Sequence, residues 1–357
     1  MRRWGAAALV ISATIILSGL SSLTARAASI DGAPQIAGLQ FDQSSVSVSG
    51  LNVATVKVSV RLKDADGVDQ VADGGSLLPT PLLAVEDVST GDRQLVFLDL
   101  SSGTIYDGWW QGDVIIGSHY NGELRVAEVE AYDKQANQLD ADPASSGFDP
   151  RLAVIGTDIP HLSAGQSPLP AMYGNSLTFK GRLTHADTGA AWPGVAITIL
   201  SPDLDACCSV LKTLTTDSQG YWGITFSSEQ IPEFVYAAIT YHGSDFFSRN
   251  FFMAFNGIEP RIWWRVWAAT RSTRIRLGTT TTIYGSVAPA TLGTYEYLQR
   301  LVSGVWKTVA TTYAHSSGRF YLTAHPPSRG YQRYRVLVAQ NGVFIPTATK
   351  TLTIYAY

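Results

Sequence analysis

Closely spaced acidic residues are the first feature of this sequence that could bind a ligand. Asp64, Asp66 and Asp69 surround a glycine, and Asp133 or the Asp140–Asp142 segment could lie near them. Oxygen-rich clusters can hold Ca²⁺, which takes roughly six to eight oxygen ligands. The full EF-hand spacing is absent, and aspartates in turns commonly accept hydrogen bonds from the local backbone. We therefore expect a solvated turn and assign no metal-ligating residue.

Cys207 and Cys208 are the only two cysteines, and they are adjacent. Neighbouring Cα atoms lie about 3.8 Å apart across a trans peptide, whereas an ordinary disulfide spans about 4.4–6.8 Å. A bond between them would close a strained ring, and strained bridges are labile. Two free thiols and an intermolecular link are the alternatives. We expect a vicinal disulfide with a local structural effect.

The sequence contains no recognisable catalytic motif. Its six histidines form no HxH, HExxH or Cys–His metal spacing, and no GxSxG, P-loop or GxGxxG occurs. The acidic residues are scattered, so no pair stands out for the acid–base chemistry of a glycosidase. We predict a protein without a catalytic residue or a cofactor, and keep a hydrolase with a site assembled only in space as the third hypothesis.

Charge is distributed very unevenly along the 357 residues, although the net charge is only −3. Residues 28–158 contain 20 acidic and 7 basic residues, residues 159–257 contain 7 and 4, and residues 258–357 contain 2 and 12. The last segment is also rich in aromatic residues. Basic surfaces with exposed rings can hold anionic polymers. The small net charge therefore does not exclude a polyanion partner for the last segment.

Arginines and tryptophans of the last segment are the candidate binding residues. Arg333 and Arg335 alternate with Tyr334 and should face water together. Trp263 and Trp264 are adjacent, so one should point outward if both lie in a strand. The full candidate set is Arg274, Arg276, Arg333, Arg335, Trp263 and Trp264. Their partner would be a cell-envelope glycan or another anionic polymer, or the acidic segment of the same or a second copy of the chain. We expect no nucleic acid partner.

Short β-strands must position these residues. Residues 56–63 alternate apolar and polar side chains with period two, and similar runs recur along the chain, separated by Asp-Gly, Gly-Gly and Asn-Gly turns. Between Leu124 and Tyr132 the alternation changes phase, which indicates a β-bulge. No sustained helical period follows the N-terminal apolar stretch. These patterns predict an all-β protein built of β-sandwiches.

An internal repeat divides the second half of the chain. Gly174 and Gly181 flank a Ser/Thr-rich strand, as do Gly278 and Gly285, and residues 218–225 match residues 316–323. Equal spacing of several markers indicates two copies of one module. We therefore predict domains at 28–158, 159–257 and 258–357, in which the second and third are the repeat copies.

The repeat also carries a resemblance to known modules. Residues 173–184, 194–200 and 215–226 read YGNSLTFKGRLT, GVAITIL and TTDSQGYWGITF, and residues 276–287 and 316–324 read RLGTTTTIYGSV and SSGRFYLTA. They resemble the bacterial, actinobacterial-type immunoglobulin-like and carboxypeptidase-regulatory-like modules of exported proteins, and residues 102–110 and 122–138 are similar to another such module. The resemblance implies three tandem Ig-like β-sandwiches with accessory, adhesive or spacing roles, and it transfers no catalytic residue.

The N-terminus predicts export. Arg2 and Arg3 precede an apolar stretch, and Ala25-Arg26-Ala27 fits a cleavage site, which gives a signal peptide at 1–27. No later segment is apolar enough to span a bilayer, so we expect no stable membrane insertion after cleavage. The sequence therefore predicts a secreted, non-catalytic structural or adhesive protein, which the cell surface could retain non-covalently. Its alternative function is polysaccharide or anionic-polymer binding through the C-terminal domain.

Overall fold

The computed structural model describes residues 32–70, 81–203, 207–240, 252–290 and 293–357, without the side chains of residues 203, 207, 208 and 252. These ranges contain β-strands and one short 3₁₀ helix, η1, at Pro143–Ser146, so the predicted all-β fold is confirmed. The predicted signal peptide lies outside the described residues. Among the residues described, no helix is long and apolar enough to cross a membrane.

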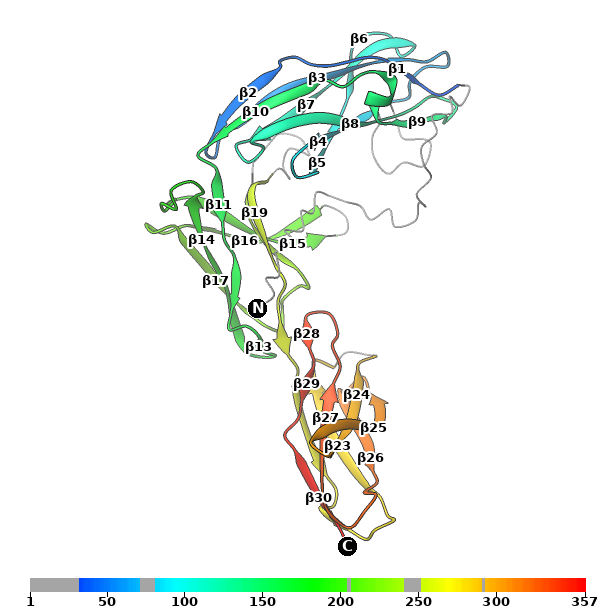
Figure 1. Cartoon of the computed structure of the whole chain (residues 1–357), viewed down its shortest axis with the longest axis vertical. Coiled ribbons are helices and arrows are strands. Elements are labelled where there is room, and N and C mark those ends of the chain that lie inside the picture. Colours follow the sequence, from blue (N-terminus) through cyan, green and yellow to red (C-terminus); the bar gives the residue numbers. More distant parts are fainter. Residues whose placement is uncertain (1–31, 71–80, 204–206, 241–251, 291–292) are drawn as a thin grey trace.

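The first ten strands form the N-terminal sandwich (Figure 1). One sheet has the order β1-β3-β7-β6, and the other has the order β2-β10-β8-β4-β5 with β9 beside β8. The strands are β1 Gln35–Phe41, β2 Ser45–Ser49, β3 Val53–Lys63, β4 Leu82–Asp87, β5 Arg93–Phe97, β6 Asp99–Gly103, β7 Asp107–Gly117, β8 Gly122–Tyr132, β9 Gln138–Ala141 and β10 Arg151–Thr157.

Period-two alternation places the core of this sandwich between its sheets. Val56, Val58, Val60 and Leu62 of β3 are buried against Trp110 of β7 and apolar residues of the other sheet. In β8 the pairing with β4 skips one residue, because Ala84 pairs with Glu128 and Val85 pairs with Val126. The bulge predicted in this strand is therefore confirmed.

Strands β11 to β19 form the middle sandwich (Figure 1). In one sheet β14 pairs with β11, β12 and β17, and the other sheet has the order β16-β15-β18-β19. The strands are β11 Pro160–Leu162, β12 Gly165–Ser167, β13 Ala171–Met172, β14 Ser176–His185, β15 Ala196–Asp203, β16 Cys207–Thr215, β17 Tyr221–Ser227, β18 Val235–Thr240 and β19 Phe252–Ile258.

The C-terminal sandwich contains the remaining strands. One sheet has the order β21-β23-β26, and the other has the order β22-β30-β27-β24-β25 with β29 beside β27. The strands are β20 Ile262–Trp263, β21 Arg265–Thr270, β22 Arg274–Ile275, β23 Thr281–Ala288, β24 Tyr295–Val302, β25 Val305–Tyr313, β26 Arg319–Ala324, β27 Gly330–Val338, β28 Phe344–Ile345, β29 Thr347–Ala348 and β30 Leu352–Ala356.

The repeated glycines occupy the same places in the middle and C-terminal sandwiches. Gly181 pairs with Trp222 between β14 and β17, and Gly285 pairs with Phe320 between β23 and β26. A Cβ at Gly181 would lie 1.8 Å from the carbonyl oxygen of Ser163, and one at Gly285 would lie 2.1 Å from that of Trp267. Close backbone approach therefore requires glycine at both positions.

A small parallel sheet joins the middle and C-terminal sandwiches. It has the order β13-β20-β28, so three distant segments meet there. Ile262 of β20 lies in the core of the middle sandwich, and the ring of Phe344 in β28 packs against the same core. Phe344 also stacks on Trp264 of the C-terminal sandwich, with 4.3 Å between ring centres. The junction is therefore a packed interface.

The junction between the N-terminal and middle sandwiches is also packed. Ile115 of β7 is buried in the core of the middle sandwich, and Leu51, Val53 and Tyr120 pack against that core. The imidazole of His185 stacks on Trp192, and its Nδ1 lies against a carboxylate oxygen of Asp158. Apolar contact and a polar pair thus hold these two sandwiches together.

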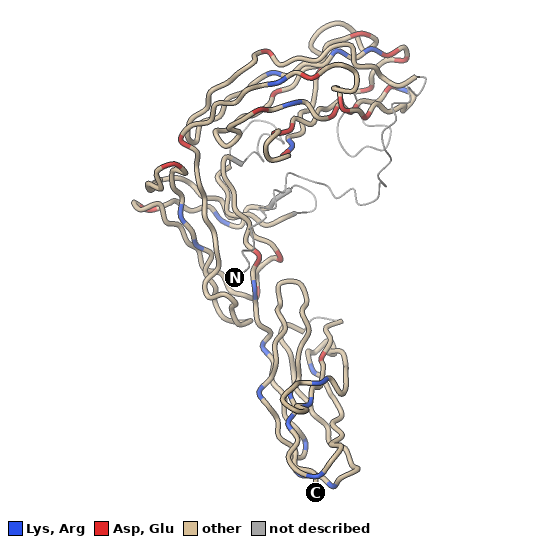
Figure 2. Tube along the Cα trace, in the orientation of Figure 1, with Lys and Arg blue, Asp and Glu red and all other residues tan. Residues whose placement is uncertain are grey.

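The three sandwiches follow one another from the N-terminal end to the C-terminal end of an elongated, bent molecule (Figure 1). Figure 2 shows Asp and Glu concentrated at the N-terminal end and Lys and Arg at the C-terminal end. The middle sandwich separates the acidic N-terminal sandwich from the basic C-terminal one along the molecule.

Candidate functional site

The strongest candidate site is the outer face of sheet β22-β30-β27-β24-β25, here called the basic sheet face. Tyr334 and Val336 of β27 point into the core and are fully buried. Arg333 and Arg335 alternate with them and therefore point outward, as predicted. The face contains Arg274, Arg333, Arg335, Trp306, Tyr331 and Tyr355, and it continues to Tyr295, Tyr297, Tyr313 and Tyr357.

Arg335 is held in place across three strands. Its guanidinium carbon lies 4.5 Å from the centre of the Trp306 ring in β25. Its Nε donates a 2.8 Å hydrogen bond to Oε1 of Gln299 in β24, the strand between them. Partial burial lowers the pKa of Arg335, but a guanidinium remains charged at neutral pH. The remaining guanidinium nitrogens are thus presented on a fixed aromatic support.

Arg274 forms a similar arrangement at the other edge of the face. Its guanidinium carbon lies 5.6 Å from the ring centre of Tyr355 and 5.7 Å from that of Tyr357. The ring of Tyr355 lies 4.9 Å from that of Tyr331 in β27, and the side chain of Tyr331 is 77% exposed. Cations and rings therefore alternate across neighbouring strands, an arrangement that can hold anionic groups beside stacked apolar surfaces.

Tyrosines extend the face along β24 and β25. The ring centres of Tyr295 and Tyr297 lie 6.0 Å apart in a stacked arrangement, and the Tyr313 hydroxyl donates a 2.5 Å hydrogen bond to that of Tyr295. This hydrogen bond raises the pKa of Tyr313. These rings add stacking surface without negative charge at neutral pH.

The cations of this sandwich have no internal counter-ions among the described residues. The nine ion pairs of lysine or arginine with aspartate or glutamate that the described ranges contain all lie in the N-terminal sandwich. Residues 258–357 contain only Glu259 and Glu296 as acids. Glu296 is fully buried, and Glu259 precedes β20 at the junction. The positive charge of the basic sheet face is therefore available to an external anion.

The remaining predicted binding residues have different outcomes. Arg276 is exposed just after β22, near the edge of the basic sheet face. Trp263 is exposed, but it lies in the junction sheet. Trp264 is fully buried, and its indole N–H donates a 2.9 Å hydrogen bond to the carbonyl of Ala339. This buried position corrects the assignment of Trp264 as a binding residue, because the side chain closes the core at the junction.

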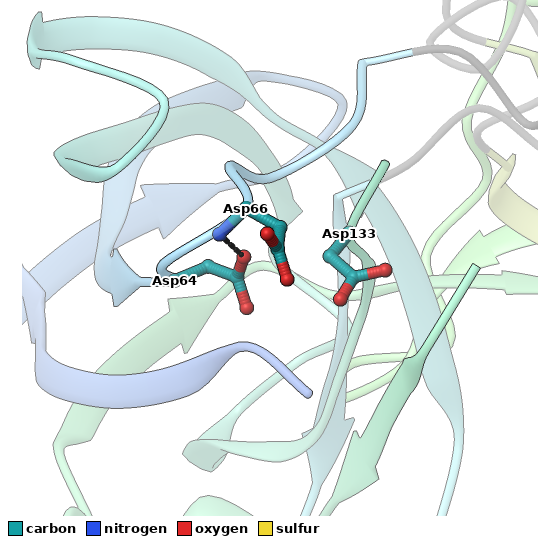
Figure 3. A group of neighbouring side chains, drawn as sticks. All are labelled: Asp64, Asp66 and Asp133. Carbon is teal, nitrogen blue, oxygen red and sulfur yellow. Dashed lines mark hydrogen bonds between the residues drawn. The ribbon is translucent and has the colours of Figure 1, made fainter. Parts of the chain in front are cut away.

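The structure brings Asp64, Asp66 and Asp133 together (Figure 3), with one carboxylate oxygen from each within 4.8 Å of the others. These are the described residues that could hold a metal ion. Oδ1 of Asp64 accepts 2.8 Å hydrogen bonds from the N–H groups of Asp66 and Gly67, and Oδ1 of Asp133 accepts two from Gln135 and Asn137. These bonds give Asp64 and Asp133 a structural role in their turns, as the sequence predicts for aspartates in turns, but both residues are buried and not solvated.

The other predicted acids lie elsewhere. Asp142 caps η1 by accepting a hydrogen bond from the N–H of Ala144, and it pairs with Arg125. Cys207 and Cys208 begin β16, where their backbones pair with Asp203 and Pro202. Their side chains lie outside the described part of the chain, so the vicinal disulfide stays a prediction.

Sequence reasoning missed the aromatic partners of the arginines. Trp306 reaches Arg335 only because β25 and β27 flank β24, and the register of β25 on β24 shifts between Leu298 and Gln299. The alternation of Arg333 and Arg335 with apolar residues predicted the side of the sheet on which they lie, but it did not predict which side chains of neighbouring strands they contact. The stacking of Arg274 on Tyr355 depends likewise on the parallel pairing of β22 with β30.

Comparison with known proteins yields structural neighbours only. No protein family matches the sequence, and no curated protein matches it. A tetra-tandem repeat from the extending region of a large adhesion protein shares 15% identity, covers 89% of this chain and 74% of its own, and has a TM-score of 0.25. The Escherichia coli adhesin FdeC shares 13% identity over 89% of this chain and 96% of its own, with a TM-score of 0.26. Murine CEACAM1b shares 10% identity over 55% and 100%, with a TM-score of 0.29. These scores are too low to carry an argument, so function has to be argued from the surfaces described above.

Proposed function

We propose that this protein is a non-catalytic structural or adhesive element that works outside the cell as a stiff array of β-sandwiches. The observation that carries the proposal is the packing at both junctions, where Ile115 and Ile262 enter the core of the middle sandwich from its two neighbours. A spacer needs this property, because a loosely linked chain would not hold its two ends apart.

Fractionation of the source cells tests the proposed location. We expect the chain in the medium or in a surface fraction that a high-salt wash releases, since a basic surface bound to an envelope polymer loses affinity as salt screens its charges. A chain that stays in the cytoplasmic fraction contradicts the proposal. An N-terminus that begins near residue 28 in the secreted form would support the predicted cleavage.

Binding of an anionic envelope polymer through the basic sheet face is the second function that we propose. It is supported by Arg335 on Trp306, by Arg274 on Tyr355, and by the absence of ion pairs among the described residues of this sandwich. A polymer with acidic groups and sugar rings would use both the cations and the aromatic surfaces. An acidic sandwich from a second copy of the chain would use chiefly the cations.

An array of glycans and teichoic acids, probed with residues 28–357, tests this function. The double variant Arg333→Glu and Arg335→Glu should lose at least tenfold in affinity for acidic polymers. The matched control is the double variant Arg271→Glu and Arg319→Glu; both arginines are exposed, Arg319 at the start of β26 and Arg271 just after β21, in the other sheet's part of the same sandwich. Equal losses of affinity in both variants would show that only the net charge matters, and would contradict binding at the basic sheet face. Salt-sensitive self-association without polymer binding would favour a second copy as the partner, and turnover of any polymer would refute the non-catalytic proposal.

A further inference from the structure

The middle sandwich carries a second cationic surface, separate from the basic sheet face. In its first sheet, β14 pairs with β12 on one side and with β17 on the other. Leu177, Phe179 and Leu183 of β14 are buried in the core. Lys180 and Arg182 alternate with them, so they point away from the core on the central strand of this sheet.

A hollow lies beside Lys180 and is lined on one side by Gly223 of β17. Lys180 pairs with Gly165 of β12 on one side and with Gly223 of β17 on the other. Neither glycine has a side chain to cover the neighbouring lysine. The hollow is a shallow, open depression on the sheet surface with a volume of about 760 Å³. It is lined by Ser163, Thr178, Lys180, Arg182, Tyr221, Gly223 and Thr225, among others.

The polar groups of the hollow suit an anion that also bears hydroxyl groups. Nε of Arg182 donates a 2.8 Å hydrogen bond to the carbonyl of Gln219, and its guanidinium carbon lies 5.3 Å from the Tyr221 ring centre. The hydroxyls of Thr178 and Thr225 lie 2.9 Å apart. The lining contains no acidic residue, and within the described ranges neither Lys180 nor Arg182 forms an ion pair.

The repeat supplies an internal comparison. Gly181 and Gly285 are equivalent, so Lys180 corresponds to Tyr284. By the same register, Gly223 corresponds to Tyr321. The C-terminal copy thus has two tyrosine rings where the middle copy has a lysine and an open notch. The shared fold therefore does not require the open notch at Gly223.

We propose that this hollow binds one acidic sugar unit of a glycan. The carboxylate would pair with Lys180 and with the free guanidinium nitrogens of Arg182, the sugar hydroxyls would meet Thr178 and Thr225, and the ring would occupy the space above Gly223 beside Tyr221. Charge complementarity and the hydroxyl lining select this occupant. The proposal does not depend on polymer binding by the basic sheet face.

The test uses residues 28–357 with Arg333→Glu and Arg335→Glu, so that the basic sheet face does not contribute. The probe is tetragalacturonate, and its methyl ester is the neutral control. Calorimetry should give one site for the acid and at least tenfold weaker binding for the ester. Hydrogen exchange should show protection of the 221–227 strand by the acid.

Three variants decide the assignment. Lys180→Gln should weaken binding about tenfold, and Gly223→Tyr should abolish it while thermal unfolding confirms the fold, since Tyr321 occupies the equivalent place. Lys212→Gln, an exposed change on the other sheet, should leave affinity unchanged. No binding of the acid, equal binding of the ester, or unchanged binding by Gly223→Tyr would overturn the proposal. Tighter binding of a single-stranded oligonucleotide to the same strand would overturn it as well.

Discussion

Single residues show where sequence patterns reach their limit. Alternation placed Arg333 and Arg335 on the outer side of β27 correctly, because the period of a strand fixes the side of each residue. The rule does not cover Trp263 and Trp264 in the same way, because Trp263 ends β20 and Trp264 lies between β20 and β21, although Trp263 is exposed and Trp264 is buried. Pairing partners such as Trp306 depend on strand order and register, which no local pattern encodes.

Glu296 leads to the prediction that belongs to this scale. It lies fully buried in β24, and neither carboxylate oxygen has a hydrogen-bond partner among the described residues. Burial raises the pKa of this carboxyl to about 7, whereas an unfolded glutamate titrates near about 4.3. The folded state therefore binds the proton more tightly. Proton binding by Glu296 therefore stabilises the folded state at pH 4. This contribution of roughly 1–3 kcal/mol to the free energy of unfolding is lost as the pH rises to about 7.

Denaturant unfolding of the wild type and Glu296→Gln between pH 4.5 and 8 measures this effect. We expect the free energy of unfolding of the wild-type C-terminal sandwich to fall over this range, and the neutral variant to be flatter and more stable at pH 8. Glu259→Gln, which changes an exposed acid of the same segment, is the matched control. Parallel curves for the wild type and Glu296→Gln would refute the prediction.

At the scale of elements, the sequence predicts most strands but not the shortest ones. Glycine spacing identified the equivalent pairs β14–β17 and β23–β26, because backbone contact at Gly181 and Gly285 leaves no room for a side chain. Comparing the two copies residue by residue would also have revealed the hollow, where Lys180 and Gly223 replace two tyrosines. The two-residue strands β13, β20 and β28 are too short for any periodicity.

Glycine substitutions test this account of the repeat. Gly181→Ala should destabilise the middle sandwich by about 2–4 kcal/mol, because its Cβ would collide with the carbonyl oxygen of Ser163. Gly223→Ala is the control, because Gly223 follows Trp222, the residue of β17 that pairs with Gly181. Its Cβ would meet no atom closer than 3.5 Å, so its stability should change by less than about 1 kcal/mol. Equal losses in urea unfolding would show that close packing at Gly181 is not the constraint.

At the scale of the whole molecule, the separation of the acidic and basic sandwiches depends on the stiffness of the junctions between them. Figure 2 shows acidic residues concentrated in the N-terminal sandwich, whereas the charged residues of the C-terminal sandwich are almost all basic, and packed junctions keep these two sandwiches apart. The sequence showed the uneven charge and the repeat boundary, but composition cannot distinguish a linker from a packed interface. The junction sheet forms between segments that lie about ninety residues apart, Ala171–Met172 with Ile262–Trp263, so only the folded chain brings them together.

Phe344 should therefore control the shape of the molecule more than the stability of any one sandwich. Its ring contacts Trp264 on one side and lies 5.8 Å from the ring centre of Tyr173 on the other. Phe344→Ala should weaken the junction by about 1–3 kcal/mol, less than the roughly 3–5 kcal/mol cost of removing a fully buried phenylalanine. Small-angle scattering should then show a broader distance distribution than the wild type, while strand content is retained. Tyr331→Ala removes an exposed ring far from the junction and should leave the curve unchanged. A scattering curve for Phe344→Ala that matches the wild type would mean that the hydrogen bonds between β13, β20 and β28 suffice to hold the two sandwiches in line.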